Sequence, residues 1–492
     1  MATGGVRPAH RPVRPVSRGV VLAVDNGSQS TKVSVVNAEG RVLAQASRPL
    51  HAYDVSVPGR VVHPGDDLWD SVVAACGAAV AAYGRPEEIV AVGLCTIRYC
   101  RALLDERGGL VEPVMSWMDP RVAGPFDAAA DPRVRWVTTS SGYVTHRFTG
   151  RFVDTRANYA GAWPVDQETA DWSEDPADYV RTGLPREMLF DLVSPGERLG
   201  VVTEAASAAT GVPAGVPVVA TANDKAVEAL GCGLRSPDTV LLSLGTYIAS
   251  MTVGTSPFPR DDSHWVNFGS APGEYLYESG GIRRGMWTVS WFRDLVAGGL
   301  PPGVRPEAVL DDEAAAVPAG CGGLVALLDW LAPPDAPWRR GALLGFDGSQ
   351  GRGAIHRAIL EGIAMTMARH VEAMERGLGR SFSTVLVSGG GARSDVMTQV
   401  VADVLRRPAR RTAFTDAAGL GAAVCAAVGV GLHPGFDAAV DAMVREGSEV
   451  APGPDAAVYR DLRPRYDALL AHTDPLLRAL QGLDPSAEAR VP

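Results

Sequence analysis

Short apolar runs joined by glycine-rich turns recur along the chain, and this pattern is typical of an α/β fold. The apolar run 20–24 leads into a turn over 25–32 and then into a second run at 33–36. The run 240–244 leads in the same way through a turn at 245–246 into 247–250. Each segment predicts a strand, a tight turn and another strand. Turns that combine glycine with hydroxyl side chains direct N–H and O–H groups toward an anion, so the repetition predicts a duplicated core that holds phosphate groups.

The remaining apolar patterns predict further helices and strands. Helical spacing is found at 66–83, 226–230, 353–378, 394–405, 419–428 and 454–480. Runs that predict strands lie at 42–44, 89–94, 101–105, 217–222 and 384–388. A break in the pattern at 235–238 predicts a domain boundary. We therefore expect a disordered leader at 1–17, an N-terminal domain at 18–236, a C-terminal domain at 237–447, and a terminal helix and tail at 448–492.

Composition narrows the classes of function. The 492 residues carry a net charge of −10 without long acidic blocks, which argues against nucleic acid as a partner because phosphate backbones bind basic surfaces. The six cysteines are scattered, so we expect reduced, buried thiols rather than disulfides or a metal site. No apolar run reaches the length of a membrane span, and 1–17 lacks the hydrophobic stretch of a signal peptide. These features predict a cytoplasmic protein and do not argue against a nucleotide as its ligand.

The first turn places charged and hydroxyl side chains where phosphates would bind. Asp25 stands at the carboxyl end of its predicted strand, where open sheets bind ligands, and Lys32 brings a positive charge to a phosphate oxygen. The turn also offers a glycine for close backbone approach and three hydroxyls, at Gly27, Ser28, Ser30 and Thr31. A carboxylate that holds Mg²⁺ through water, with an ammonium beside it, suits a magnesium nucleotide. An ordinary Asn-Gly hairpin is the alternative.

Two loops in the second half complete the candidate nucleotide site. Gly245 and Thr246 repeat the strand-turn-strand arrangement, with a plain turn as the alternative. A triplet of glycines, formed by Gly389, Gly390 and Gly391, lies between a predicted strand and a predicted helix, where a base or ribose fits against the backbone. A helix-entry loop is the alternative there. The order of all these motifs along the chain is harder to produce by chance than any one of them.

Asp224 is the candidate catalytic residue. Together with Asn223 it follows an apolar strand and precedes a helix, so we expect it at a strand end beside a helix N-terminus. A general base at this position would accept the proton of a substrate hydroxyl that attacks a γ-phosphate. Phosphoryl transfer requires little more than such a base, a metal and several hydrogen-bond donors. The alternative is that the carboxylate only caps the helix.

Taken together, these motifs resemble the FGGY carbohydrate kinases, which belong to the superfamily of actin, hexokinase and Hsp70. The resemblance covers roughly residues 19–435. Besides the phosphate motifs at 25–32 and 243–246, it rests on segments similar to the family's Trp-x-Asp-x-Arg stretch, catalytic-aspartate stretch, long helix and adenosine motif, at 116–121, 223–233, 357–364 and 389–404. It implies two ribonuclease H-like (actin-like ATPase) domains, each a mixed five-stranded sheet flanked by helices, with a cleft between them.

The resemblance also implies roles for individual residues. Asp224 would deprotonate a sugar hydroxyl, and Asp25 would hold Mg²⁺, with Asp224 as a further metal contact. Thr246 and the loop 389–393, Arg393 included, would contact ATP. The implied cofactors are therefore ATP and Mg²⁺. Because members of the family are often dimers, a homodimer is an expectation.

The segment that contacts sugar in the family departs from its known patterns. Ile97-Arg98-Tyr99 aligns there, but it matches neither the Gln-Met-His of xylulose kinases nor the Gln-Arg-Glu of glycerol kinases. We expect Arg98 and Tyr99 either to hydrogen-bond substrate hydroxyls, together with Asn223, or to be structural partners of Asp119. The resemblance implies ATP-dependent phosphorylation of a primary hydroxyl of a small sugar or polyol, with a ketopentose such as xylulose first. Alternatives are a kinase for another polyol, a cyclitol or an autoinducer-2-type signalling dione, or a catalytically weak, nucleotide-dependent sugar sensor.

Overall fold

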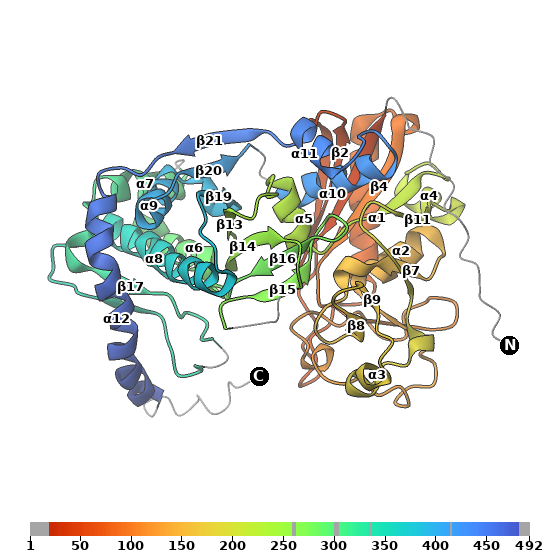
Figure 1. Ribbon diagram of the computed structural model, residues 1–492, viewed down its shortest axis with the longest axis horizontal. Helices are drawn as coiled ribbons and strands as arrows, with labels where there is room; N and C mark the ends of the chain where they lie inside the picture. Colours follow the sequence, from red (N-terminus) through yellow and green to blue (C-terminus); the bar gives the residue numbers. More distant parts are fainter. Residues whose placement is uncertain (1–18, 258–261, 300–304, 334–335, 414–415, 482–492) are drawn as a thin grey trace. The chain divides into compact units, whose positions relative to one another are not determined.

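A computed structural model describes residues 19–257, 262–299, 305–333, 336–413 and 416–481 (Figure 1). The chain forms two compact units. The first runs up to Val227 and also takes in Ser270–Pro272 and Ala418–Val444, and the second contains the remainder. Each unit is built on a β-sheet with parallel and antiparallel neighbours, so the predicted α/β class is confirmed.

The sheet of the first unit has six strands in the order β11-β12-β4-β1-β2-β3. Its strands are β1 (Val20–Asn26), β2 (Ser30–Asn37), β3 (Val42–Pro49), β4 (Ile89–Thr96), β11 (Arg198–Val201) and β12 (Pro217–Ala220). β4 is parallel to both β1 and β12, whereas the other pairs are antiparallel. The carboxyl ends of β1, β4 and β12 therefore lie at the same edge of the sheet.

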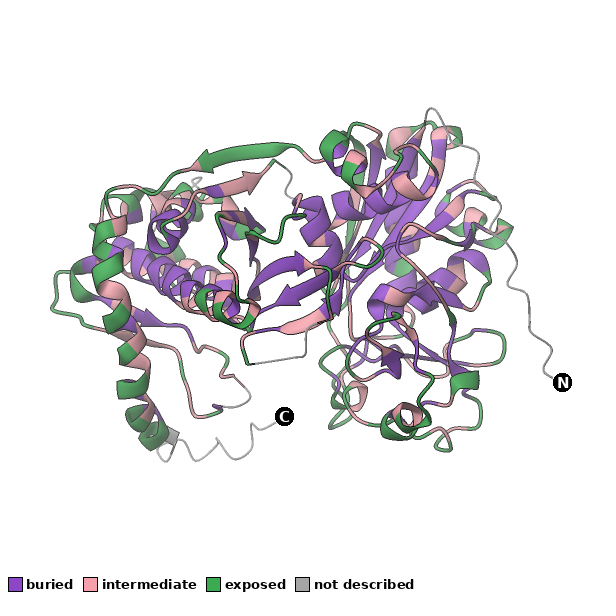
Figure 2. Cartoon of the chain, in the orientation of Figure 1, coloured by how far each residue is buried: buried purple, intermediate pink, exposed green. Residues whose placement is uncertain are grey.

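Helices cover both faces of this sheet. On one face, α1 (Asp67–Tyr83) and α2 (Ser140–Thr149) contribute to a hydrophobic core with Leu22 and Leu94. On the other face, Gly93 lets α10 (Ala417–Gly429) approach the backbone, because a Cβ at this position would lie 2.3 Å from the carbonyl oxygen of Ala422. Figure 2 shows buried residues concentrated in these central strands.

Smaller elements complete the first unit. The short strands are β5 (Ala102–Leu104), β6 (Trp136–Thr138), β7 (Val153–Thr155), β8 (Val165–Asp166), β9 (Asp171–Trp172) and β10 (Asp191–Val193). They form three two-stranded sheets, β5-β6, β7-β10 and β8-β9. The remaining helices are α3 (Pro176–Thr182), α4 (Glu204–Thr210) and α11 (Phe436–Met443), with 3₁₀ turns at Pro86–Glu88, Pro120–Val122, Arg156–Asn158 and Arg186–Met188.

The sheet of the second unit has seven strands in the order β15-β16-β14-β13-β19-β20-β21. They are β13 (Thr239–Leu244), β14 (Ile248–Gly254), β15 (Trp265–Phe268), β16 (Tyr275–Glu278), β19 (Thr384–Ser388), β20 (Ala409–Thr412) and β21 (Glu446–Val450). The helices are α6 (Gly285–Val296), α7 (Pro306–Ala315), α8 (Arg352–Leu378), α9 (Asp395–Leu405) and α12 (Ala456–Gln481), with 3₁₀ turns at Ala297–Gly299, Cys321–Gly323 and Gly390–Arg393. A separate two-stranded sheet pairs β17 (Val325–Leu327) with β18 (Ala342–Leu344). Helix α5 (Asp224–Gly231) contains the point at which the two units divide.

The structure differs from the sequence prediction in several details. The sheets have six and seven strands rather than five, because short or exposed edge strands such as β11 and β21 add to each core. The run 101–105 forms only β5, which pairs with β6 outside the main sheet. The helix expected at 419–428, within the 237–447 domain, is α10 and belongs to the first unit, and the units divide within α5 rather than at 235–238. The leader 1–17 lies outside the described residues.

None of the helices in the described ranges carries an apolar stretch of the length needed to cross a bilayer.

Candidate active site

The first glycine turn is a tight hairpin between β1 and β2. Asp25 is paired directly with Lys32 across the two strands, so both side chains leave the sheet on the same face. Only 8% of Asp25 is exposed. The turn is closed by a hydrogen bond of 3.2 Å from the Gly27 amide to the Ser30 carbonyl, and Ser28 at its tip is exposed. The predicted carboxylate, ammonium and glycine are therefore brought together at the carboxyl end of β1.

Thr31 has a different place from the one expected of a phosphate contact. It is fully buried, and its Oγ1 lies 2.6 Å from Asn26 Nδ2, which donates to it, and 2.7 Å from Ser71 Oγ on α1. This network ties the hairpin to the helix beneath it. The prediction that Thr31 contacts a nucleotide is corrected accordingly: its hydroxyl stabilises the turn from inside.

Asp224 is the first residue of α5 and follows β12 after the short connection 221–223. The side chain that caps this helix belongs to Asn223, whose Oδ1 accepts a hydrogen bond of 3.0 Å from the Ala226 amide. Asn223 Nδ2 donates to the Ala157 carbonyl (3.2 Å), and the residue is 3% exposed. Asn223 is therefore a structural residue, which corrects its expected role as a substrate contact. Asp224 Oδ1 also accepts a hydrogen bond of 2.9 Å from the Lys225 amide at the same helix end, and 29% of the Asp224 side chain is exposed.

Arg98 approaches this carboxylate from the neighbouring strand. β4 ends at Thr96, and Arg98 Nε lies 3.6 Å from Asp224 Oδ1, with 13% of the Arg98 side chain exposed. The guanidinium carbon also lies 5.1 Å from the centre of the Tyr99 ring, an arrangement favourable for a cation–π contact. Tyr99 adopts a positive φ of 62°, which is uncommon for a residue with a side chain. The parallel strands β4 and β12 thus deliver a cation and an acid to one place.

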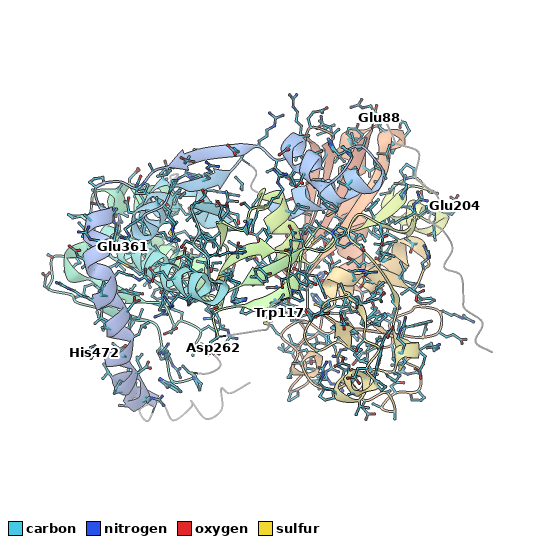
Figure 3. The ribbon with its side chains drawn as sticks, in the orientation of Figure 1. Glu88, Trp117, Glu204, Asp262, Glu361 and His472 are labelled. Atoms are coloured by element: carbon cyan, nitrogen blue, oxygen red, sulfur yellow. The ribbon has the colours of Figure 1, made fainter. Side chains whose placement is uncertain are left out.

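The alternative that Arg98 is a structural partner of Asp119 is not what the structure shows. Asp119 is 1% exposed and binds Arg121 through Nε at 2.9 Å and Nη2 at 2.8 Å. Its second oxygen also accepts a hydrogen bond from the Val61 amide at 2.9 Å. Nearby, 47% of Trp117 is exposed (Figure 3). Asp119 and Arg121 therefore bond to each other, and Arg98 pairs with Asp224 instead.

A buried acid supports the segment that holds Asn223. Asp154 is fully buried and accepts hydrogen bonds from Thr139 Oγ1 at 2.8 Å and Ser141 Oγ at 2.7 Å. Burial raises the pKa of this carboxyl to about 6, although these hydrogen bonds act in the opposite direction. The next residue, Thr155, donates from its hydroxyl to the Thr221 carbonyl. Asp154 therefore fixes the backbone against which the Asp224 segment rests. The sequence offered no signal for it, since its partners lie on other elements.

In the second unit, the other two predicted loops are neighbours. β13 and β19 are parallel, and Ser243 is paired with Ser388, so both strands end at the same level. Gly389 has a φ of 81°, and a Cβ there would lie 2.7 Å from the Leu244 carbonyl oxygen, which only glycine avoids. The exposed residues of this edge are Thr246, Gly389, Gly390 and Arg393, whereas Gly245 is half-buried and Gly391 is buried against Met286 and Leu244. The structure thus brings the turn at 245–246 and the glycine triplet together.

Glu228 is a residue that sequence reasoning missed. Its Oε1 accepts hydrogen bonds from Ser243 Oγ at 2.7 Å and from Ser388 Oγ at 2.6 Å. Each serine stands at the end of a strand that leads into one of the two glycine loops. Glu228 lies one helical turn after Asp224 on α5. A single carboxylate therefore joins both loop-bearing strands to the helix that begins with the candidate base.

The groups gathered here suit a phosphate-held metal rather than a protein cage. In the described part of the chain, no group of three or more His, Cys, Asp or Glu side chains is arranged to hold a metal ion. Mg²⁺ in nucleotide sites commonly takes one or two carboxylates and completes its shell with phosphates and water. The carboxylate of Asp25, beside Lys32 at a strand end, fits that requirement. The donor set is thus compatible with a magnesium nucleotide.

Comparisons with known proteins give matches over most of the chain. Residues 20–130 and 128–231 match the N-terminal domain of the FGGY family of carbohydrate kinases, and residues 240–430 match the C-terminal domain of that family. The uncharacterized sugar kinase YgcE of Escherichia coli (strain K12) is 43% identical over 475 residues, which cover 94% of this chain and 96% of that protein. The L-fuculokinase of the same strain is 25% identical and covers 84% and 93%. Among solved structures, the xylulose kinase of Rhodospirillum rubrum superposes with a TM-score of 0.79 at 26% identity, covering 93% of this chain and 99% of that one.

Proposed function

Because the chain belongs to the FGGY family of carbohydrate kinases, we propose that it transfers the γ-phosphoryl group of ATP to a primary hydroxyl of a small sugar or polyol. A ketopentose such as xylulose is the leading acceptor. The observation that carries the proposal is the place of Asp224, partly exposed at the start of α5 with Arg98 at 3.6 Å. That arrangement puts an acid where a substrate hydroxyl can reach it.

In the proposed reaction, Asp224 accepts the proton of the attacking hydroxyl. The oxygen of that hydroxyl forms a bond to the γ-phosphorus, the bond between this phosphorus and the leaving oxygen of ADP breaks, and the proton passes later from Asp224 to water. A positioned base of this kind contributes typically 10²- to 10⁴-fold to a rate. Arg98 orients the carboxylate and offers hydrogen bonds to other oxygens of the acceptor, as does Tyr99.

The residues proposed to contact ATP lie in the glycine loops. In the first unit they are Gly27, Ser28, Ser30 and Lys32, and in the second unit they are Gly245, Thr246, Gly389, Gly390 and Arg393. Asp25 would hold Mg²⁺ through water, with Asp224 as a further contact. When bound, the metal supplies positive charge that neutralises the phosphates.

A second candidate acceptor follows from Arg98. The autoinducer-2 kinases also have a basic residue at this position, so a signalling dione is the second candidate acceptor. Another polyol or a cyclitol is a further alternative. The candidate outside enzymology is a sensor that binds nucleotide and sugar with little turnover. An intact Asp224 together with Asp25 favours chemistry over sensing.

The test is ADP release by the full chain in the presence of each member of a panel. The panel contains xylulose, L-fuculose, glycerol, gluconate and an autoinducer-2-type dione. We expect one acceptor to raise ADP release well above the basal rate and Asp224→Asn to remove that increase. A basal ATPase rate that no acceptor changes, with acceptors nevertheless raising the melting temperature alongside a non-hydrolysable ATP analogue, would support the sensor instead.

A further inference from the structure

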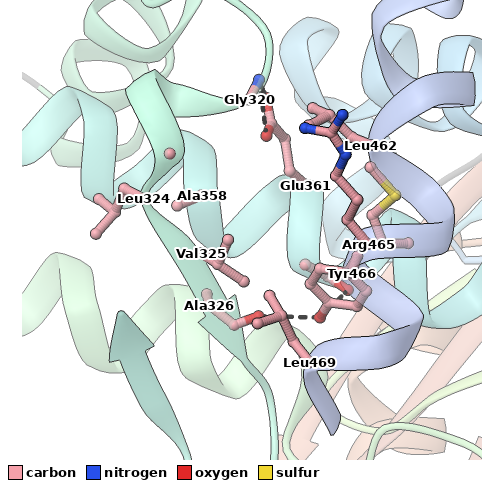
Figure 4. Close-up of a pocket in the computed structure, with 13 residues that line it drawn as sticks. Gly320, Leu324, Val325, Ala326, Ala358, Glu361, Leu462, Arg465, Tyr466 and Leu469 are labelled. Atoms are coloured by element: carbon pink, nitrogen blue, oxygen red, sulfur yellow. Dashed lines mark hydrogen bonds between the residues drawn. The ribbon is translucent and has the colours of Figure 1, made fainter. Parts of the chain in front are cut away.

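The second unit contains two cavities that the proposed reaction does not use. The first lies between α8, β17 and α12 and has a volume of about 90 Å³ (Figure 4). Its walls are almost entirely apolar, two of its polar side chains are already bonded, and Arg465 at its rim is exposed. Tyr466 Oη donates to the Ala326 carbonyl at 3.0 Å, and Glu361 accepts from the Gly320 amide at 3.1 Å. Nothing in this cavity selects a ligand.

The second cavity has about 260 Å³ and a different character. It lies between the segment 280–283, residues 328–333, and the facing parts of α8 and α12. Its charged and polar walls come from Arg283, Asp329, Arg339, Thr366, Arg369 and His370. Three guanidinium groups therefore face one space that contains a single carboxylate.

Two of the three arginines already have bonds. Arg339 forms a double hydrogen bond with Asp474, from Nε at 2.9 Å and Nη2 at 3.0 Å. Arg283 donates from Nη1 to the Ala332 carbonyl at 2.8 Å, which leaves its charge uncompensated by that bond. For Arg369 there is no hydrogen bond or ion pair with any residue in the described ranges. A half-buried guanidinium without an anionic partner raises the affinity of its surroundings for an anion.

His370 lies in the same wall of the cavity. Its Nδ1 is buried and has no hydrogen-bond partner among the described residues. Burial, together with the positive charge of Arg369, lowers the pKa of this imidazole to about 4. The neutral ring donates its one N–H to the backbone of Gly280, so His370 supports the 280–283 wall rather than binding the ligand itself.

The wall formed by 280–283 is continuous with the second phosphate turn. Ile282 pairs with Ile248 through backbone hydrogen bonds of 3.1 and 2.9 Å. Gly281 lies against the Tyr247 ring, since a Cβ on it would come within 2.5 Å of that ring. Tyr247 and Ile248 directly follow Thr246. Any ligand that orders 280–283 therefore acts on the backbone next to Thr246.

We propose that this cavity is an effector site for a small oxyanion, the phosphate or carboxylate group of a metabolite, bound by Arg369 and Arg283. Guanidinium groups suit this role because their planar fork matches the oxygens of both anions. All of the lining residues belong to the second unit, whereas Asp224 and Arg98 lie in the first. Occupancy stabilises the 280–283 segment and with it the second phosphate turn. Anion binding in this cavity does not depend on turnover.

The test measures anion binding to the full chain by calorimetry, with a saturating non-hydrolysable ATP analogue present so that the phosphate turns are occupied. The probes are inorganic phosphate and citrate, which separate the two sources of oxyanion. We expect Arg369→Met to weaken binding about tenfold or more, since it removes a charge-assisted bidentate partner but keeps an apolar stem. Arg376→Met, at an exposed position of the same helix, is the matched control and should bind like the parent.

Three further outcomes decide the proposal. Binding of citrate alone with the same dependence on Arg369 assigns the site to carboxylates. Binding that neither Arg369→Met nor Arg283→Met weakens would overturn it, because the anion then sits elsewhere. The proposal would also be overturned if neither phosphate nor citrate binds at concentrations up to roughly 20 mM, because a weaker affinity does not suit an effector. If Arg369→Met fails to fold, Arg283→Met carries the test.

Discussion

Arg98 and Asp224 leave two parallel strands, β4 and β12, and meet with Nε and Oδ1 3.6 Å apart. Neither residue lies in a regular strand, yet the register of the sheet decides that they face each other. In the proposed reaction, Arg98 donates hydrogen bonds to oxygens of the sugar, and Asp224 accepts the proton of the attacking hydroxyl. It is the point on which the proposed chemistry depends.

Arg98→Met should lower kcat/KM for the sugar acceptor about a hundredfold, because the substrate loses its charged donor and the carboxylate its orienting partner. Arg98→Lys should recover part of this loss, since an ammonium keeps the positive charge but lacks the planar set of N–H donors of a guanidinium. Initial rates measured at several concentrations of the best acceptor give kcat/KM for both variants. Arg107→Met, at an exposed turn, is the control. Equal kcat/KM in Arg98→Met and the parent would remove Arg98 from the site.

Asp224→Asn should lower kcat about a thousandfold while the protein still binds nucleotide, because the amide cannot accept the hydroxyl proton. The helix should remain intact, since Asn223 supplies the cap. Melting temperature with and without a non-hydrolysable ATP analogue checks binding, and ADP release checks turnover. Near-parental turnover in this variant would exclude Asp224 as the base.

Asp25→Asn should raise the concentration of Mg²⁺ needed for half-maximal activity about tenfold, because a charged metal contact is lost. The comparison variant is Glu106→Ala, which removes a carboxylate at an exposed turn. Activity titrated against Mg²⁺ at fixed ATP provides the measurement. Superimposable titrations for Asp25→Asn and the parent contradict the metal role.

Glu228→Ala should destabilise the protein by about 2 kcal/mol, since the buried hydroxyls of Ser243 and Ser388 lose their shared acceptor. Glu228→Gln keeps a side-chain oxygen and should lose less. Because both serines precede the loops proposed to bind ATP, KM for ATP should rise more in the alanine variant than in the glutamine variant. Unfolding by denaturant and ATP titration test the two parts separately. Identical behaviour of the two variants would show that the hydroxyl contacts do not position the loops.

Asp154 should give the protein a pH-dependent stability. Its pKa is raised to about 6 in the folded state from an ordinary value of 3.8, so the folded state holds the proton more tightly than the unfolded state. The stabilisation is fully present below about pH 4 and is lost as the pH rises to about 6, by roughly 3 kcal/mol. Asp154→Asn lacks this titration. The difference in unfolding free energy between parent and variant should therefore change between pH 4 and pH 6 and stay constant above it.

The local sequence determined the α/β class, the two glycine hairpins and the order of the acid between them. These features are local, because a strand that ends in Gly and hydroxyl residues is defined by its own side chains. The family resemblance followed from the same local motifs. Even the helices 353–378 and 394–405 were placed within a residue of α8 and α9.

Only the tertiary structure decided the roles of several residues near Asp224 and in the Asp25 hairpin. Asn223 and Thr31 carry the side chains of ligand-binding residues, but packing turned both inward, where Ala157, Ala226, Asn26 and Ser71 satisfy them. Glu228 and Asp154 matter because hydroxyls from distant elements converge on them. A sequence lists donors and acceptors one at a time. Burial and register decide which of them meet, because a buried polar group must find its partner wherever the fold places one.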